Sequence, residues 1–218
     1  MMSYRLSRRV AVEFIGMFLF VFTVGMATEP RNHAGALLAP IAIGSVLMVL
    51  VFAGGHVSGG HYNPAVSTAV LFRGRMKVHE YIAYLITQFL AAVLAGLLVR
   101  GIGGREVAGA TASTGKMIVV ELLFTFALAY VVLNVATAKG TAGNSFYGLA
   151  IGFVVVVGAI SVGWISGAAF NPAIALGATI FGAFPWSHIW IYLVADLAGA
   201  IVAAWAFLYI QGENARAD

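Results

Sequence analysis

Charged side chains are scarce in this sequence: Asp, Glu, Lys and Arg make up 9% of its 218 residues, while 61% of the residues are hydrophobic. A soluble domain of this size needs a polar surface that this composition does not supply. Cysteine is absent, which excludes a disulfide scaffold and leaves no redox signal of the compartment. No cleavable signal peptide is evident, because the basic start from Met1 to Arg9 leads into an apolar run long enough to span a bilayer. The composition indicates an integral membrane protein.

The formal net charge is +4, and its position along the chain decides its meaning. The basic residues lie near the ends of the apolar runs, where lipid headgroups and membrane topology place Lys and Arg. We therefore interpret the basic balance as a membrane feature and expect no nucleic-acid partner.

Six apolar segments are long enough to cross a hydrocarbon core about 30 Å thick, which takes about 20 residues. They are Val10–Thr28, Ala36–His56, Val78–Gly101, Lys116–Thr137, Asn144–Ile165 and Trp186–Gln211. Two shorter apolar pieces, Asn63–Phe72 and Asn171–Phe181, are each about half a span at a rise of 1.5 Å per residue. Such short pieces are typical of re-entrant elements or of surface loops.

The distribution of Lys and Arg predicts the orientation of the six crossings. Eight basic residues fall on one side: Arg5, Arg8, Arg9, Arg73, Arg75, Lys77, Lys139 and Arg216. Four fall on the other: Arg31, Arg100, Arg105 and Lys116. The positive-inside rule therefore places both termini in the cytoplasm of a multi-pass cell (inner or plasma) membrane protein.

The two halves of the chain match in spacing and in local sequence. Glu13 precedes Asn63 by 50 residues, as Glu121 precedes Asn171, and Gln88 and Asp196 each follow their Asn by 25. Each half holds three spans, an odd number, so the second half is inserted upside down relative to the first. We predict one transmembrane domain over residues 1–218, built as an inverted repeat of approximately 1–112 and 113–218.

The repeated tripeptides Asn63-Pro64-Ala65 and Asn171-Pro172-Ala173 predict two helix starts, because Asn is a preferred N-cap and Pro is favoured at the first helical position. Non-helical backbone at membrane depth is tolerated only inside protein or beside a water-filled cavity. We therefore expect 58–62 and 166–170 to run extended along a cavity and to expose backbone carbonyls. The two half-helices would then begin near the midplane, with the positive ends of their dipoles facing each other.

On these residues the chain resembles the aquaporin (major intrinsic protein) family, and the resemblance covers essentially the whole chain. It implies an all-α bundle of six transmembrane helices and two re-entrant half-helices, with one pore per subunit, in a homotetramer without cofactors. It also implies that Glu13 and Glu121 brace the two re-entrant loops.

The resemblance also implies a four-residue selectivity filter, and here the sequence departs from common members. Water- and glycerol-conducting relatives carry an Arg directly after the second Asn-Pro-Ala, where this chain has Ile174. The other filter positions correspond to Ile43, Ala159 and Ala168. No filter side chain then carries a charge or a donor. Such a wide apolar filter favours neutral solutes over strongly hydrated ions, since burying an unpaired charge is costly.

Among relatives, an aliphatic residue in place of the filter Arg resembles a bacterial branch linked to arsenic resistance. That branch passes arsenite and organoarsenicals, so we predict a passive channel for metalloid hydroxides and glycerol-like solutes. A water-selective or water/glycerol pore stays open as the alternative.

Five other residues of the two loops are candidates for lining the pore. They are Gly59, Gly60, His61, Ser166 and Gly167. His61 has no second ligand at metal spacing, so we expect no metal site. Asp196, midway along the sixth span, has no family motif that explains it; a charge at that depth marks a functional or interhelical site.

Three other classes of protein fit the sequence less well. An enzyme is disfavoured, because no nucleophile, base and orienting group occur together and no phosphate loop is present. A secondary transporter shares inverted repeats and broken helices, but it needs an ionisable site at the midplane, for which only Asp196 is available. A non-conducting junction protein would need larger extramembrane loops than this chain has.

Overall fold

The computed structural model describes residues 4–30, 32–103 and 113–215. Three of the basic residues used to predict the orientation, Arg31, Arg105 and Arg216, lie outside these ranges. Within the described ranges the chain is helical and forms no strand.

Six long helices make up the bundle: α1 (Leu6–Ala27), α2 (His33–Ser58), α4 (Val78–Gly103), α5 (Thr114–Thr137), α6 (Tyr147–Ser166) and α8 (Ile189–Gln211). Two short helices, α3 (Pro64–Phe72) and α7 (Pro172–Ile180), lie between α2 and α4 and between α6 and α8. Three 3₁₀ turns complete the described elements: η1 (Lys139–Thr141), η2 (Trp186–His188) and η3 (Gly212–Ala215). All six long helices are apolar enough to span a membrane, so the predicted all-α membrane fold is confirmed.

Several predicted span ends differ from the helices by up to four residues, and for two of them the side chains show the reason. The first helix begins at Leu6 instead of Val10, because Arg9 turns inward and its guanidinium bonds to Glu80 and Tyr84 of α4. The fifth begins at Tyr147 instead of Asn144. The amide of Asn144 donates to the carbonyl oxygens of Val135 in α5 and Thr141 in η1, and its side-chain oxygen accepts the N–H of Phe146, which holds Asn144 outside the helix.

Both short helices begin as the Asn-Pro-Ala tripeptides predict. The side-chain oxygen of Asn63 accepts the backbone N–H of Ala65 at 2.8 Å, and Pro64 occupies the first helical position. The oxygen of Asn171 accepts the N–H of Ala173 at 3.0 Å in the same way. The caps satisfy N–H groups that would otherwise be unpaired at a buried helix end.

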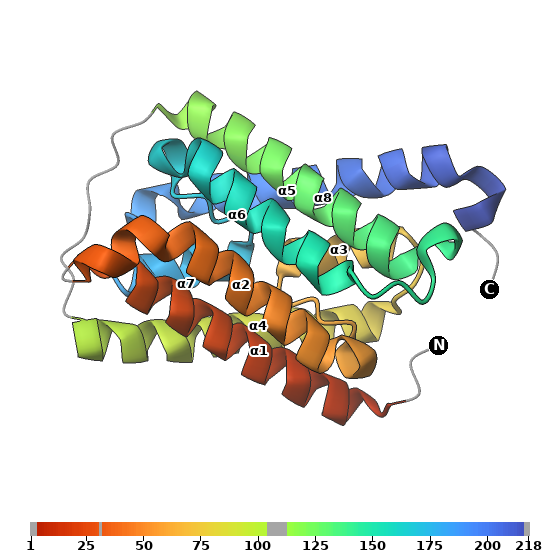
Figure 1. The fold of residues 1–218 in the computed structure, drawn as a ribbon, viewed down its shortest axis with the longest axis horizontal. Helices are drawn as coiled ribbons and strands as arrows, with labels where there is room; N and C mark the ends of the chain where they lie inside the picture. Colours follow the sequence, from red (N-terminus) through yellow and green to blue (C-terminus); the bar gives the residue numbers. More distant parts are fainter. Residues whose placement is uncertain (1–3, 31, 104–112, 216–218) are drawn as a thin grey trace.

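The short helices interlock the two halves of the chain. α1 packs on α2 and α4, and α5 packs on α6 and α8. α3, however, lies against α8 and α5 as well as α4, while α7 lies against α4 and α1 as well as α8. In Figure 1, α1 begins and α8 ends at the same end of the bundle. That arrangement agrees with an even number of crossings.

The contact between α2 and α6 depends on two glycines. A Cβ built on Gly44 would lie 2.5 Å from the carbonyl oxygen of Gly152, and one on Gly152 would meet the carbonyl oxygen of Gly44 even more closely. Only glycine lets the two backbones approach this far, as in other membrane helix pairs with small residues at the crossing.

We expect Gly152→Ala to force α2 and α6 apart and to destabilise the bundle by about 1–3 kcal/mol, the usual range for overpacking. The loss is measured as a lower melting temperature of the detergent-solubilised protein, followed by size-exclusion chromatography after heating. Gly101→Ala is the matched control, because nothing lies within 4 Å of a Cβ at Gly101. Equal melting temperatures of the two variants would contradict the close approach.

Candidate pore and solute filter

The two re-entrant loops meet through their asparagines. The Nδ2 of Asn63 donates to the carbonyl oxygen of Phe170 at 2.9 Å, and the Nδ2 of Asn171 donates to the carbonyl oxygen of Tyr62 at 2.9 Å. Each side-chain oxygen is already used as a cap within its own half. An amide nitrogen carries two hydrogens, so one N–H of each Asn remains beyond this cross-link.

The loops ahead of the two asparagines are not extended, so that part of the sequence prediction is wrong. Each contains left-handed residues: Gly59, Gly60 and Tyr62 in the first, and Gly167, Ala168 and Phe170 in the second, with φ between 43° and 91°. A non-glycine residue in this region costs about 1–3 kcal/mol. The left-handed residues turn the backbone so that two consecutive N–H groups of each loop meet one buried carboxylate.

In the first loop that acceptor is Glu13. Its Oε1 accepts the hydroxyl of Ser58 at 2.7 Å and the backbone N–H of His61 at 2.9 Å. Its Oε2 accepts the N–H of Tyr62 at 2.7 Å and the Nε2 of Gln88 at 2.9 Å. The carboxylate is fully buried, and these four donors offset the cost of burying it.

In the second loop Glu121 takes the same place. Its Oε1 accepts the hydroxyl of Ser166 at 2.5 Å and the N–H of Ala169 at 3.1 Å, and its Oε2 accepts the N–H of Phe170 at 2.8 Å. Glu121 is also fully buried. Both carboxylates thus hold the backbone next to the cross-linked asparagines.

Two tyrosines, which the sequence analysis missed, fix the start of each loop. The hydroxyl of Tyr84 donates to the carbonyl oxygen of Ser58 at 2.6 Å, and that of Tyr192 donates to the carbonyl oxygen of Ser166 at 2.5 Å. A signal was available: each tyrosine lies one helical turn before Gln88 or Asp196, at the same spacing in both halves. These bonds and those from the asparagines use the first and last carbonyls of each loop, which leaves fewer free acceptors than predicted.

The polar side chains of the loops face protein. His61 is buried, with its Nδ1 3.0 Å from the hydroxyl of Ser67 and its ring against Tyr84. Ser166 is buried on Glu121. Gly59 and Gly60 lie in the turn beside His61, and a Cβ on Gly60 would approach the backbone of α2. A contribution of these residues to the conducting path stays a prediction.

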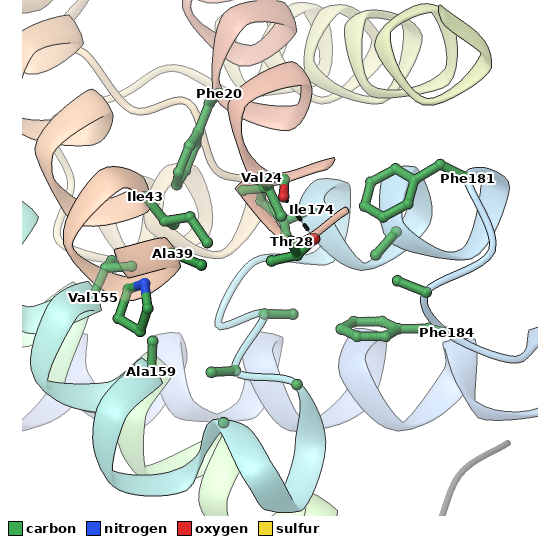
Figure 2. Close-up of a pocket in the computed structure, with 17 residues that line it drawn as sticks. Phe20, Val24, Thr28, Ala39, Ile43, Val155, Ala159, Ile174, Phe181 and Phe184 are labelled. Atoms are coloured by element: carbon green, nitrogen blue, oxygen red, sulfur yellow. Dashed lines mark hydrogen bonds between the residues drawn. The ribbon is translucent and has the colours of Figure 1, made fainter. Parts of the chain in front are cut away.

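A cavity of about 380 Å³ lies at the end of the bundle where α1 ends and α2 begins. This is the end opposite to the start of α1 and the end of α8 (Figure 1). Ile43, Ala159, Ala168 and Ile174 all line it. They come from α2, α6, the second loop and α7, so four different parts of the fold converge on one space. Figure 2 shows Ile43 and Ala159 on one wall and Ile174 near the centre of the view.

The rest of the cavity wall was not predicted. Aromatic rings from three elements face it: Phe20 of α1, Phe181 at the end of α7, and Phe184 in the turn that follows. Phe184 stacks on Tyr192 with ring centroids 4.8 Å apart and covers Gly167. The sequence carries no signal for these rings, because they have no partner in the other half of the repeat, belong to no motif and carry no charge.

One side chain of the cavity wall carries a polar group. Thr28 lines the cavity, and its hydroxyl donates to the carbonyl oxygen of Val24 at 2.7 Å (Figure 2). The other lining side chains are aliphatic, aromatic or absent. Across the described ranges no three His, Asp or Glu residues gather in a way that could hold a metal ion.

Known proteins of similar sequence and fold are transport proteins. Aquaporin NIP1-1 of Zea mays is 34% identical over 216 residues, which cover 95% of this chain and 76% of that protein. Glycerol uptake facilitator protein-like 6 of Lactiplantibacillus plantarum is 35% identical over 217 residues, covering 95% of this chain and 100% of that protein. The X-ray structure of the aquaglyceroporin from Plasmodium falciparum shares the fold with a TM-score of 0.82 at 20% identity, over 97% of this chain and 99% of that one.

Residues 1–207 match the family described as Major intrinsic protein. Proteins of this family are channels, which confirms that the chain is not an enzyme and that it passes small solutes across a membrane. With six helices that can span, two capped half-helices and a cavity at their junction, the chain belongs to the major intrinsic protein family, as a multi-pass channel of the aquaporin and aquaglyceroporin type.

Proposed function

We propose that this channel passes small neutral solutes, above all metalloid hydroxides such as arsenite, together with organoarsenicals and glycerol-like molecules. The observation that carries the proposal is the wall of the cavity of about 380 Å³, where Ile174, directly after the second Asn-Pro-Ala, lies with Ile43, Ala159 and Ala168. The polarity and width of this wall then select the solute.

The filter's chemistry favours solutes that need few side-chain donors. Two alanines leave room that larger side chains would fill, and neither isoleucine can hydrogen-bond. A neutral polyhydroxy solute loses fewer strong water contacts here than an ion does, because an ion leaves its hydration shell with no compensating charge. Arsenous acid is uncharged near neutral pH and offers hydroxyls, as glycerol does.

Exclusion of cations and protons then depends on the half-helices. α3 and α7 are capped by Asn63 and Asn171, and each of these asparagines donates to a carbonyl of the opposite loop. The positive ends of both helix dipoles therefore lie close together. Side-chain arginines and half-helix dipoles are the two barriers to cations and protons in such pores. Without an Arg at position 174, we infer a lower barrier that rests on the dipoles alone.

A glycerol or water pore is the second candidate. One relative is named a glycerol uptake facilitator protein-like protein, and the structural neighbour is called an aquaglyceroporin. An apolar constriction also resists wetting, so we expect water flux to be modest relative to solute flux.

The assembly, the topology and the repeat belong to the same proposal. We propose a homotetramer with one pore per subunit, both termini in the cytoplasm of the cell membrane, and an inverted repeat of about 1–112 and 113–218. The support is the basic-residue asymmetry and the paired contacts of Glu13 and Glu121. On this topology the cavity faces outward, and the asparagines form the middle of the pore.

The first test is stopped-flow light scattering on proteoliposomes, challenged in turn with an impermeant osmolyte, glycerol and arsenite. We expect fast re-swelling in glycerol and arsenite with modest water flux. Fast water flux without solute uptake would instead mean a water channel. Flux that saturates at modest concentration and follows Na⁺ or pH gradients would contradict a passive pore.

The filter assignment is tested by Ile174→Arg. We expect glycerol and arsenite flux to fall about tenfold, because a barrier raised by about 1.4 kcal/mol slows passage by that factor, while water flux persists. Ile174→Val is the matched control and should leave solute flux at least as high as in the parent. Unchanged glycerol and arsenite flux in the Arg variant would refute the role of this position.

A further inference from the structure

The two halves of the protein differ at one buried polar position behind the loops. Gln88 of α4 and Asp196 of α8 follow their asparagines by the same 25 residues, and both are fully buried. One carries an amide and the other a carboxyl group. The filter and the asparagines of the pore do not explain this difference.

In the first half the amide completes the hydrogen bonding of a carboxylate. The Nε2 of Gln88 donates to Oε2 of Glu13 at 2.9 Å and contacts the hydroxyl of Ser67 at 3.1 Å. Glu13 thus accepts four neutral donors, one of them the amide from α4.

In the second half a carboxyl group meets a carboxyl group. Asp196 of α8 lies beside Glu121 of α5, because it bonds to Thr125, which follows Glu121 by one turn on the same face of α5. Thr125 donates its hydroxyl to Oδ1 of Asp196 at 3.1 Å, whereas Oδ2 of Asp196 is buried without any donor. Ala175 stands where the first half has Ser67, so no hydroxyl from α7 fills the gap.

The groups that face Asp196 from the surrounding helices supply no positive charge. α5 presents Glu121 and Thr125, and the backbone N–H of Asn171, the cap of α7, also faces Asp196. On α8 itself the hydroxyl of Tyr192 donates to the carbonyl oxygen of Ser166. Arg73, directly after α3, bonds to Thr137 and to the carbonyl oxygen of Ala215. Within the described ranges, no Lys, Arg or His forms an ion pair with either carboxyl group.

Two neighbouring buried carboxyl groups with no cation beside them are not both ionised at neutral pH. We propose that Glu121 and Asp196 share one proton, and that protonated Asp196 donates to Glu121 as the amide of Gln88 donates to Glu13. Asp196 is then a positioning residue: it acts on the pore through Glu121.

The proton matters for conduction because of what Glu121 holds. Glu121 binds Ser166 and the N–H groups of Ala169 and Phe170, on either side of filter residue Ala168. Ala168 and Phe170 are left-handed, a conformation that persists only where the surrounding structure holds it. Loss of the shared proton places two like charges in contact, which displaces the loop and narrows or closes the filter at alkaline pH.

The experiment is glycerol flux into proteoliposomes of the full-length protein, with the pH equal on both sides and raised stepwise from neutral to alkaline. Glycerol carries no charge in this range, so its flux reports the pore alone. The inference rests on the chain's being a channel and not on which solute it passes, so a failed arsenite test leaves it standing. We expect wild-type flux to decline reversibly as pH rises.

Two variants exchange the chemistry of the halves. Asp196→Asn supplies a permanent amide donor to Glu121, and its flux should lose the alkaline decline. Gln88→Glu creates a second carboxyl pair with Glu13, and its flux should decline more steeply than that of the parent. An Asp196→Asn variant that keeps the wild-type pH profile, or a Gln88→Glu variant whose profile equals the parent's, would overturn the proposal.

Infrared spectroscopy provides a readout that does not need flux or a folded variant. The wild-type protein should show a protonated-carboxyl stretching band at neutral pH that disappears as the pH rises. Absence of such a band at neutral pH would refute the shared proton even if Asp196→Asn fails to assemble.

Discussion

Two buried carboxylates, Glu13 and Glu121, hold the two loops that lead into the Asn-Pro-Ala segments. Each accepts N–H groups from consecutive residues of a loop that lies inside the bundle and has no sheet or helix to satisfy it. Unsatisfied backbone at membrane depth costs several kcal/mol per group. Without these acceptors, nothing would stabilise the left-handed residues ahead of Asn63 and Asn171. The starts of the two half-helices would then not be held together.

The proposed filter depends on this arrangement indirectly. Ala168 sits in a braced loop, and Ile174 follows the cap of α7, so both are positioned by bonds that involve neither side chain. Ile43 and Ala159 come from α2 and α6, which approach each other through Gly44 and Gly152. The filter can therefore change its chemistry, from a charged to an apolar wall, without changing the contacts that support it. That separation explains how one fold serves solutes of different polarity.

Much of this architecture was predictable because local rules dictate it. Apolar length fixed the six spans, and Asn followed by Pro fixed both half-helix starts. The predicted boundaries failed where a side chain far away intervenes, as Arg9 does with Glu80. The loops were predicted to be extended because sequence does not show that a single carboxylate collects several adjacent N–H groups. Phe184 and Thr28 were missed because nothing in their neighbourhood along the chain distinguishes a cavity wall from ordinary packing.

By itself the sequence determined the membrane class, the number of spans, the paired Asn-Pro-Ala segments and the absence of an Arg at position 174, since each of these is a property of composition, local periodicity or a single position. Only the tertiary structure decided that Ile43, Ala159, Ala168 and Ile174 share one cavity, and that Asp196 faces Glu121. Both facts depend on how helices from different parts of the chain approach one another. That approach is set by glycine crossings and by buried hydrogen bonds between residues distant in sequence, which no local pattern encodes.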